Sequence, residues 1–492
     1  MDVRPAPPLH PATTLLAALL AACAGAARTG PPAVAAAPPA GPVGTPSPGG
    51  EVRPAPPREA PPRALARATI GATGDVMIQG AVKQAAAVHG AGWPDSGYSW
   101  LLAPVADLLA EPDLTFANLE TPVAPDADRG SREYQFNAPV AAVSALARAG
   151  VDVVSLANNH AFDQGRAGFE ETVRRVAAAG LAGVGAGPAG RSAGPLVVDV
   201  HGLKVAFLAY AYGFNQPGND CPPAASRMPE PCVQASLLDR ARAVEDVRAA
   251  AAAGADAVVV SLHWGVEYEA QPRAEDVELA HRLADAGAIA IIGHHPHVLQ
   301  PVELYRREDG STALVAYSLG NFLSNQSRRY VHGVTPPEVA ATRDGAFLRF
   351  ALERRDYGRG VTRVELAGVD YLPLWMENDT AEVDAKREPA RRPALRVVAV
   401  DRALSDVRAE LATFPDPVPP ARQPAWVRLR SREAMLADRR AASAAVVGAE
   451  LVRTLGAAEI SPPPPAWAPS EAPPGRASPA TQASAIRPSA TP

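Results

Sequence analysis

The sequence predicts an α/β fold in which two β-sheets form a sandwich with helices on its outer faces. Apolar stretches of strand length alternate with helical patterns along the first part of the chain, and strands predominate after that. Several of the apolar stretches end abruptly in Asp, Glu, Asn or His. Open α/β sheets bind their ligands at the carboxyl ends of their strands, so this pattern also predicts a functional site at one edge of the sheets.

Residues 151–163, VDVVSLANNHAFD, show the pattern most clearly. An apolar segment typical of a buried strand in a parallel sheet is followed at once by Asn158, Asn159 and His160. An Asn oxygen can bind a cation, and a neighbouring His can bind one or donate a proton. The alternative is structural, because Asn and Asp also form turns and cap helices. This stretch alone supports the two interpretations about equally.

Five further apolar runs end in the same kinds of side chain. They lead into Gly74-Asp75, Asn118-Leu119-Glu120, His263-Trp264, Gly293-His294-His295-Pro296-His297 and Gly320-Asn321. Together these side chains are the ligand set of a mixed oxygen and nitrogen metal site. The most specific signal is the pair His295 and His297, since a spacing of two places both side chains on one side of an extended backbone. The alternative is a pair of surface histidines in a turn.

Spacing also predicts the remaining elements. Helices are expected at residues 98–110, 139–149, 165–179, 235–253, 275–286, 407–414 and 433–454. A hairpin is expected from residues 196–200 and 204–212, and residues 216–234 are expected to form a long surface loop. Strands resume near residues 289, 302, 314 and 346, with weaker candidates at 361–374 and 395–400.

Composition divides the chain into five predicted parts. They are a lipoprotein signal peptide at 1–22, a Pro/Ala-rich disordered tether at 23–65, the folded domain at 66–365, an extension of unknown role at 366–460, and a disordered Pro/Ser-rich tail at 461–492. The 52 prolines cluster at the two ends, which supports the tether and the tail.

The three cysteines are interpreted by their positions. Cys23 ends Leu-Ala-Ala-Cys after a short apolar run, which resembles a bacterial lipobox and predicts an exported protein that is lipid-anchored to the cell envelope. Arg4 is the one firm positive charge before that run, which departs from the usual signal, and the alternative is an Ala-rich disordered N-terminus. Cys221 and Cys232 lie in one polar loop and are expected to form a disulfide, as suits an exported protein.

The charge balance argues against a nucleic-acid partner. Lys and Arg number 47 against 52 Asp and Glu, for a net charge of −5, and no long basic run is present. A protein that grips nucleic acid electrostatically needs such a run or a basic face.

The strand-end motifs resemble those of the poly-γ-glutamate capsule synthesis (CapA-like) protein family, whose domain is similar to calcineurin-type metallophosphatases. The matching motifs, in the order found in the family, are GDVM at 74–77, NLETP at 118–122, LANNHAFDQG at 156–165, HWGVEY at 263–268, GHHPHV at 293–298 and SLGNF at 318–322. They span residues 66–350 approximately. The resemblance implies a metallophosphatase-like αββα sandwich.

The resemblance also implies roles for individual residues. Divalent metal ions, up to two, would be bound by Asp75, Glu120, Asn159, His263, His295 and His297, with Glu120 bridging the two ions. In that assignment Asp75 and His297 bind the first ion, whereas Asn159, His263 and His295 bind the second. His160 would be the proton donor, oriented by Asp163. His294 is left out of this ligand set.

One departure leaves the function open. Metallophosphatases carry Asp-x-His at the first strand, whereas here Asp75 is followed by Val76-Met77, so one His ligand is missing. The leading hypothesis is an exported protein of capsule polymer synthesis, transport or anchoring, with a metal-dependent hydrolase site for an anionic polymer or a phosphoester. The alternatives are a non-catalytic envelope scaffold that binds polymer or a membrane synthase, and a phosphoesterase unrelated to capsule.

Overall fold

The computed structural model describes residues 62–448, apart from residues 130, 131, 133, 189–193, 222–231, 359, 382 and 384–392. The predicted signal peptide, nearly all of the predicted tether with Cys23, and the predicted tail lie outside the described residues. Among the described residues, no helix combines the length and the apolar character needed to span a membrane.

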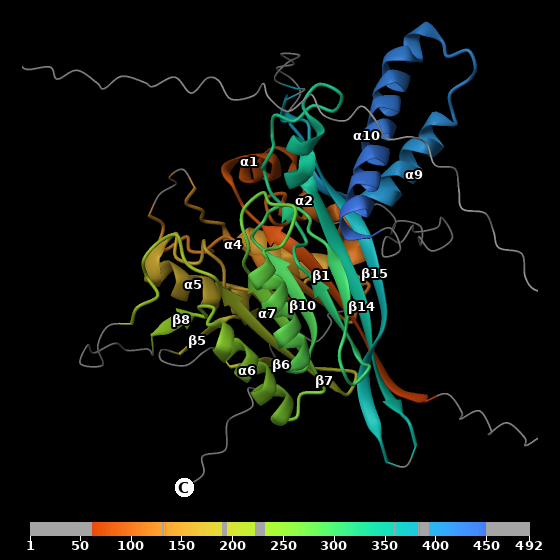
Figure 1. The fold of residues 1–492 in the computed structure, drawn as a ribbon. Coiled ribbons are helices and arrows are strands. Elements are labelled where there is room, and N and C mark those ends of the chain that lie inside the picture. The colour runs from red at the N-terminus through yellow and green to blue at the C-terminus, as the bar shows by residue number, and fades with distance from the viewer. Residues whose placement is uncertain are drawn as a thin grey trace, which may run out of the picture. The chain divides into compact units, whose positions relative to one another are not determined.

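The larger of two stacked sheets has eight strands and contains the N-terminal strand of the domain at its centre (Figure 1). Its order is β16 (Leu395–Ala399), β15 (Thr362–Asn378), β14 (Asp344–Asp356), β1 (Arg63–Val76), β2 (Leu114–Leu119), β3 (Val153–Ser155) and β4 (Ala182–Val184), and β13 (Asn321–Leu323) also pairs with β1. Strands β1 to β4 run parallel, whereas β14, β15 and β16 are antiparallel to their neighbours. The parallel half therefore directs several strand ends to one edge.

The second sheet has six strands and also has a parallel centre. Its order is β11 (Val302–Arg306), β12 (Thr312–Ala316), β10 (Ala288–His294), β9 (Ala257–His263), β7 (Leu203–Ala211) and β6 (Leu196–Val200). The predicted hairpin is confirmed as β6 and β7, which pair antiparallel. A separate two-stranded ribbon joins β5 (Ala186–Pro188) to β8 (Val233–Ala235), and β8 overlaps the end of the loop predicted at 216–234.

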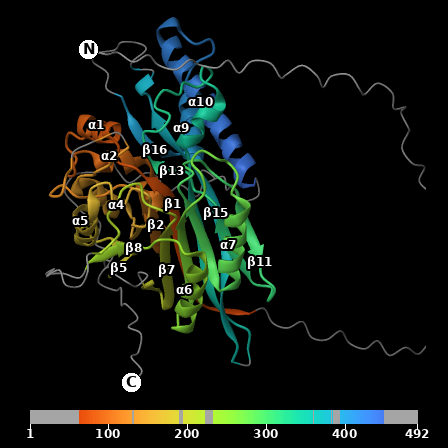
Figure 2. The same ribbon diagram turned by 60° about the vertical axis from the view of Figure 1, so that its left-hand side comes forward.

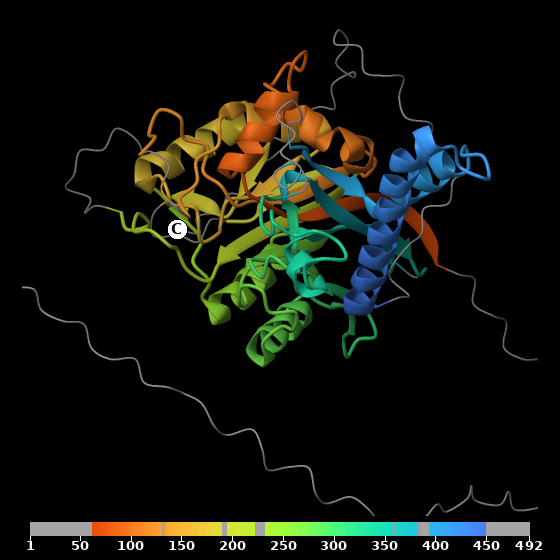
Figure 3. The same ribbon diagram turned by 90° about the horizontal axis from the view of Figure 1, so that it is seen from above.

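Helices cover the outer faces of the two sheets (Figures 2 and 3). The helices before the second sheet are α1 (Gly80–His89), α2 (Tyr98–Leu102), α3 (Ala106–Ala110), α4 (Val140–Ala149) and α5 (Gly165–Ala178), with a 3-10 turn η1 (Ala103–Val105). Helices α6 (Arg240–Ala252) and α7 (Ala274–Asp285) pack against the outer face of the second sheet. In Figure 3 the orange and gold helices lie on one side of the sheets and the green helices on the other. The predicted α/β sandwich of two sheets flanked by helices is confirmed.

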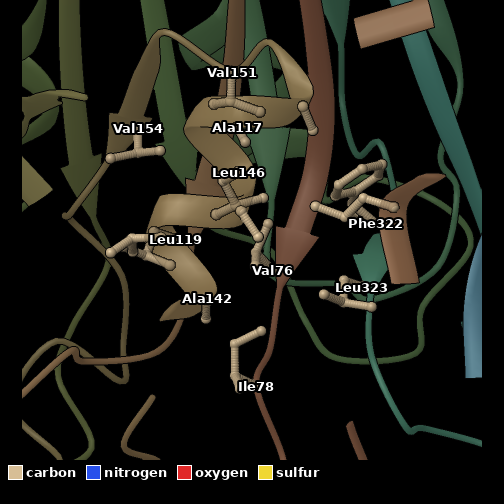
Figure 4. Close-up of a cluster of buried hydrophobic side chains, with 14 of the residues drawn as sticks. Val76, Ile78, Ala117, Leu119, Ala142, Leu146, Val151, Val154, Phe322 and Leu323 are labelled. Carbon is tan, nitrogen blue, oxygen red and sulfur yellow. The ribbon is translucent and has the colours of Figure 1, made fainter. Parts of the chain in front are cut away.

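Alternation along the strands explains how each sheet fills two apolar layers. In β2, Leu114 and Phe116 face the layer between the sheets, where Phe116 stacks on Phe207 of β7 with ring centres 6.1 Å apart. Ala117 and Leu119 face the opposite layer, beneath α4 (Figure 4). Since successive side chains of a strand point to opposite faces, Asn118 shares the face of Leu114 and Phe116 and points toward the second sheet.

The predicted boundary at residue 365 is not a boundary in the structure. It falls inside β15, which pairs with β14 along its length and carries β16 on its other edge. The first part of the predicted extension is therefore part of the larger sheet. The first half of β15 is mostly half-buried, so its apolar alternation is weak and the sequence signal is poor.

A helical hairpin follows that sheet. It consists of α9 (Val400–Leu411) and α10 (Gln423–Val447), which pack on each other and contact β15, with 3-10 turn η3 (Pro420–Arg422) between them. Both helices begin earlier than predicted. Pro424 lies in the first turn of α10, where its missing N–H is not needed, so it does not mark the end of a helix as it would in the interior.

Candidate metal centre

The six predicted metal-binding side chains lie together where the two sheets meet at their carboxyl edges. Asp75, Glu120 and Asn159 come from the ends of β1, β2 and β3, whereas His263, His295 and His297 come from the ends of β9 and β10. All six side chains are at most 3% exposed. The larger sheet thus contributes the oxygen donors and the second sheet contributes the imidazoles.

Two groups of potential ligands share Glu120. One consists of Glu120, His295 and His297, and the other of Asp75, Glu120 and His263, with the ligand atoms of each group within 4.8 Å of one another. A shared carboxylate is what a bridging ligand requires. The grouping of the histidines differs from the family-based assignment, which pairs His297 with Asp75. His297 nevertheless lies close to Asp75, since its Nδ1 is 3.2 Å from the Asp75 Oδ2.

Asp75 is held by groups from both sheets. Its Oδ1 accepts a hydrogen bond of 2.8 Å from the Asn118 side-chain amide, and its Oδ2 accepts one of 3.2 Å from the backbone N–H of His295. Burial alone would raise the pKa of Asp75, but the close imidazoles of His294 and His297 and their positive charges hold that pKa well below its usual value. Asp75 is therefore ionised in this environment.

Glu120 is the side chain that fits a cation best. It is fully buried, and neither of its carboxylate oxygens has a hydrogen-bond partner among the described residues. Its Oε1 lies 3.4 Å from the His263 Nε2 and 3.8 Å from the His297 Nε2. Burial and the nearby negative charge of Asp75 raise the pKa of Glu120 to about 8. A buried carboxylate without hydrogen bonds is costly unless a positive charge neutralises it, and a divalent ion would do so.

The imidazoles differ in their readiness to bind a metal. Burial lowers the pKa of His263 well below its usual value and that of His295 to about 2, so both rings are neutral, which is the form that binds metal ions. Burial would also lower the pKa of His297, but the carboxylates of Glu120 and Asp75 raise it to about 9. A metal ion at His297 would therefore have to displace a proton.

The predicted proton donor and its partner are hydrogen-bonded. The His160 Nδ1 lies 2.8 Å from the Asp163 Oδ2, and that oxygen also accepts a bond of 2.7 Å from the backbone N–H of Phe136. The Phe136 ring lies 4.5 Å from the His160 ring, centre to centre. Because Asp163 occupies Nδ1, the atom that His160 can use for proton transfer is Nε2.

The backbone at the two central histidines is strained. His295 has a φ of 95° and His297 a φ of 59°, which is the left-handed region that side chains rarely adopt. Such strain persists where the surrounding structure enforces it, and it is concentrated at functional sites. It also corrects the simple picture of two side chains on an extended strand, because β10 ends at His294 and both histidines lie in the turn beyond it.

Three further side chains belong to the site but were not predicted to bind the metal. His294 is completely buried, with its Nδ1 3.3 Å from the Asp75 Oδ1 and with neither ring nitrogen hydrogen-bonded to a described residue. Asn118 joins Asp75 to the second sheet, since its amide nitrogen also lies 3.3 Å from the His263 Nδ1. Tyr212 follows β7 and places its ring 4.6 Å from that of His295. The strand-end pattern contains Asn118 and His294, and Tyr212 ends the strand predicted at 204–212, but only the sheet order shows that the three meet.

The disulfide expected from the sequence is present in the structure. Cys221 and Cys232 are bonded to each other, and the Arg166 guanidinium contacts the Cys232 sulfur. Neither cysteine belongs to the groups of potential metal ligands found among the described residues. Cys221 and Cys232, the two cysteines among the described residues, therefore contribute no ligand to those groups.

Comparison with known proteins identifies relatives. The model of the family "Bacterial capsule synthesis protein PGA_cap" matches residues 69–326. The capsule biosynthesis protein CapA of Bacillus anthracis is 30% identical over 319 residues, which are 62% of this chain and 67% of that protein. The PGA biosynthesis protein CapA of Bacillus subtilis is 30% identical over 314 residues, which are 61% of this chain and 72% of that protein.

Solved structures show a weaker likeness. The calcineurin-like phosphoesterase YfkN from Bacillus subtilis aligns with a TM-score of 0.32 and 18% identity, over 64% of this chain and 91% of that one. The sulfate thiohydrolase SoxB from Thermus thermophilus aligns with a TM-score of 0.30 and 18% identity, over 55% of this chain and 41% of that one. TM-scores this low support no inference about activity or ligands. The family model and the two CapA relatives, by contrast, show that this chain belongs to the bacterial capsule synthesis protein family PGA_cap.

Proposed function

We propose that this protein acts in the synthesis, transport or anchoring of an anionic capsule polymer of the poly-γ-glutamate type, through a metal-dependent hydrolase site. The process is suggested by the CapA relatives, and the reaction by the site. The observation that carries the reaction is Glu120, a fully buried carboxyl group without a hydrogen-bond partner among the described residues, grouped with the imidazoles of His263, His295 and His297. A protein that used this fold only as a scaffold would gain nothing from burying a carboxyl group without hydrogen bonds.

The proposed ligands are those predicted from the sequence. They are Asp75, Glu120, Asn159, His263, His295 and His297, with His294 as an added candidate. Bound divalent ions would polarise a substrate oxygen and lower the pKa of a water molecule. His160 would donate a proton from Nε2 to the leaving group, while Asp163 holds the ring through Nδ1. The carboxylate of Asp75 is kept ionised for binding by the imidazoles around it.

His160→Gln tests the proposed reaction. We expect the variant to lose about 10²- to 10⁴-fold in turnover, because a general acid typically contributes that much. Its metal content should match the wild type, since His160 is not among the proposed ligands. The measurement is hydrolysis of a chromogenic phosphodiester and of oligo-γ-glutamate by the two metal-loaded proteins. His281→Gln is the matched control, because His281 bonds to Glu303 on another part of the second sheet. Full turnover by His160→Gln would contradict the assignment.

A second candidate function is a non-catalytic scaffold that binds polymer or a membrane synthase. It is favoured by Met77, a side chain only 2% exposed that stands where metallophosphatases have a His ligand. Failure of the wild-type protein to hydrolyse either probe, with metal bound, would favour this candidate. Turnover of the phosphodiester alone would instead favour a phosphoesterase unrelated to capsule.

We also propose that the protein is exported and anchored to the envelope through a lipid on Cys23. The disulfide between Cys221 and Cys232 supports export, because such bonds persist in oxidising compartments. Cys23→Ser should move the protein from the membrane fraction to the soluble fraction, as measured by fractionation and immunoblotting. Cys221→Ser, which leaves Cys23 in place, is the control. An unchanged membrane fraction in Cys23→Ser would argue against the anchor.

A further inference from the structure

An open cavity of about 390 Å³ lies beside the candidate metal centre. Its lining includes Tyr268, Gln326, Ser327, Glu338 and Thr342. The Tyr268 ring lies 6.2 Å from the His297 ring, centre to centre, so a ligand in the cavity would be within reach of the metal centre. The volume is at the lower end of the range for small-molecule sites and suits one terminal group of a larger molecule.

Hydrogen bonds through Asn321 join the cavity wall to the metal centre. The Asn321 Oδ1 lies 3.2 Å from the His297 Nδ1, while its Nδ2 donates to the Gln326 Oε1 at 2.9 Å and to the Thr342 carbonyl at 2.8 Å. One amide thus orients a candidate metal ligand and two parts of the lining together. A group bound in the cavity would therefore have a fixed position relative to the metal centre.

The backbone of the lining is strained in the same way as the histidine turn. Tyr268 has a φ of 68° and Ser327 a φ of 51°, so the left-handed residues of the cavity adjoin those at His295 and His297. A bulky residue with positive φ is a conformational outlier that its surroundings must enforce. Tyr268 is also tied to the histidine turn directly, because its N–H donates to the Pro296 carbonyl at 2.8 Å.

The charge of the cavity indicates which group it can bind. Glu338, on the 3-10 helix η2 (Pro337–Arg343), is the one charged side chain among the described residues of the lining, and it makes no ion pair with any described residue. Tyr268 adds an aromatic ring that is 57% exposed, with the Glu267 carboxylate beside it. A carboxylate without an ion pair and an aromatic ring in the same cavity both attract an ammonium group.

We infer that this cavity is a subsite for a primary ammonium group of the molecule on which the metal centre acts. The inference rests on the proposed function, and it adds that the protein recognises an amine-bearing terminus. The internal units of an anionic polymer carry no ammonium group. Two sources share this chemistry, namely the amino end of a γ-glutamyl chain and a separate small amine that binds beside it.

The test is binding of three probes to the full-length protein, measured by isothermal titration calorimetry. The probes are a short oligo-γ-glutamate with a free amino end, the same oligomer with its amino end acetylated, and alaninamide. We expect the free oligomer to bind about tenfold more tightly than the acetylated one, as one carboxylate contact and one aromatic contact would provide. Glu338→Gln should reduce that preference, because it removes the carboxylate contact and leaves the aromatic one. Glu245→Gln is the matched control, because Glu245 lines a separate cavity between α6 and α7.

Each outcome decides the inference. Equal binding of the two oligomers by the wild type, or an undiminished preference in Glu338→Gln, would overturn it. If alaninamide competes with the free oligomer for the cavity, a small amine is the natural ligand. If alaninamide does not compete but the wild type still prefers the free amino end, the chain terminus is the ligand. Failure of the proposed function is distinguishable, since a protein without metal or turnover could still prefer the free amino end.

Discussion

Glu120→Gln is expected to abolish metal binding and, at the same time, to stabilise the metal-free protein. The glutamine keeps the size of the side chain but replaces a carboxyl group whose oxygens have no hydrogen-bond partner among the described residues, and which burial makes costly to ionise. We expect the metal-free variant to unfold with a free energy about 1–3 kcal/mol higher than that of metal-free wild type. Loss of the shared carboxylate from both ligand groups should prevent stoichiometric metal binding.

Chemical denaturation and metal analysis of both proteins, with and without chelator, measure the two effects. Glu171→Gln is the matched control, because Glu171 is also buried but accepts hydrogen bonds from the backbone of Asp126 and Ala127 and pairs with Arg175. That variant should be destabilised by about 1 kcal/mol and should bind metal normally. A metal-free Glu120→Gln protein that is less stable than wild type would mean that Glu120 serves the fold and not a cation.

Trp375→Ala is expected to lower the free energy of unfolding by about 4–5 kcal/mol, which is the upper part of the range for a buried tryptophan. Trp375 lies in β15, is 1% exposed and forms the centre of the apolar cluster that joins the helical hairpin to the larger sheet. Its ring contacts Tyr330, and the guanidinium groups of Arg343 and Arg439 lie over it at 5.6 and 5.9 Å.

The same substitution tests whether the residues beyond 365 fold with the domain. Trp426→Ala is the control, because Trp426 in the same hairpin is partly exposed, and we expect it to cost about 0.5–1 kcal/mol. Arg439 also forms a buried ion pair of 3.2 Å with Asp344, so loosening this cluster would weaken a second contact of α10 with the sheet. If denaturant unfolding shows the same loss in free energy of unfolding for both variants, the helical hairpin does not contribute to the stability of the domain.

The candidate ligands could be predicted because the signal is local. Each lies at the abrupt end of an apolar run, and the parallel order of β1, β2 and β3 carries Asp75, Glu120 and Asn159 to one edge. Which sheet packs opposite these three side chains cannot be predicted from the residues next to them in the sequence. His263 and His295 meet the carboxylates only because the second sheet stacks on the first, which is a consequence of how both sheets bury their apolar faces.

Other parts of the site depend on contacts that spacing does not show. His294 adjoins His295 in the sequence, but its burial against Asp75 follows from the face of β10 to which it belongs. Tyr268 and Gln326 lie in separate loops, and only the hydrogen bonds of Asn321 and the turn at Pro296 bring them together. The boundary at 365 was misplaced for a related reason, since β15 gains its order from pairing with β14.

Metal analysis of the full-length protein tests the central claim most directly. Inductively coupled plasma mass spectrometry of the wild type should find about two divalent ions per chain after dialysis against a metal mixture. The double variant His295→Ala/His297→Ala should have lost them while keeping its circular dichroism spectrum. Absence of bound metal from the wild type under the same conditions would contradict the account and leave the strand-end cluster without its proposed cation.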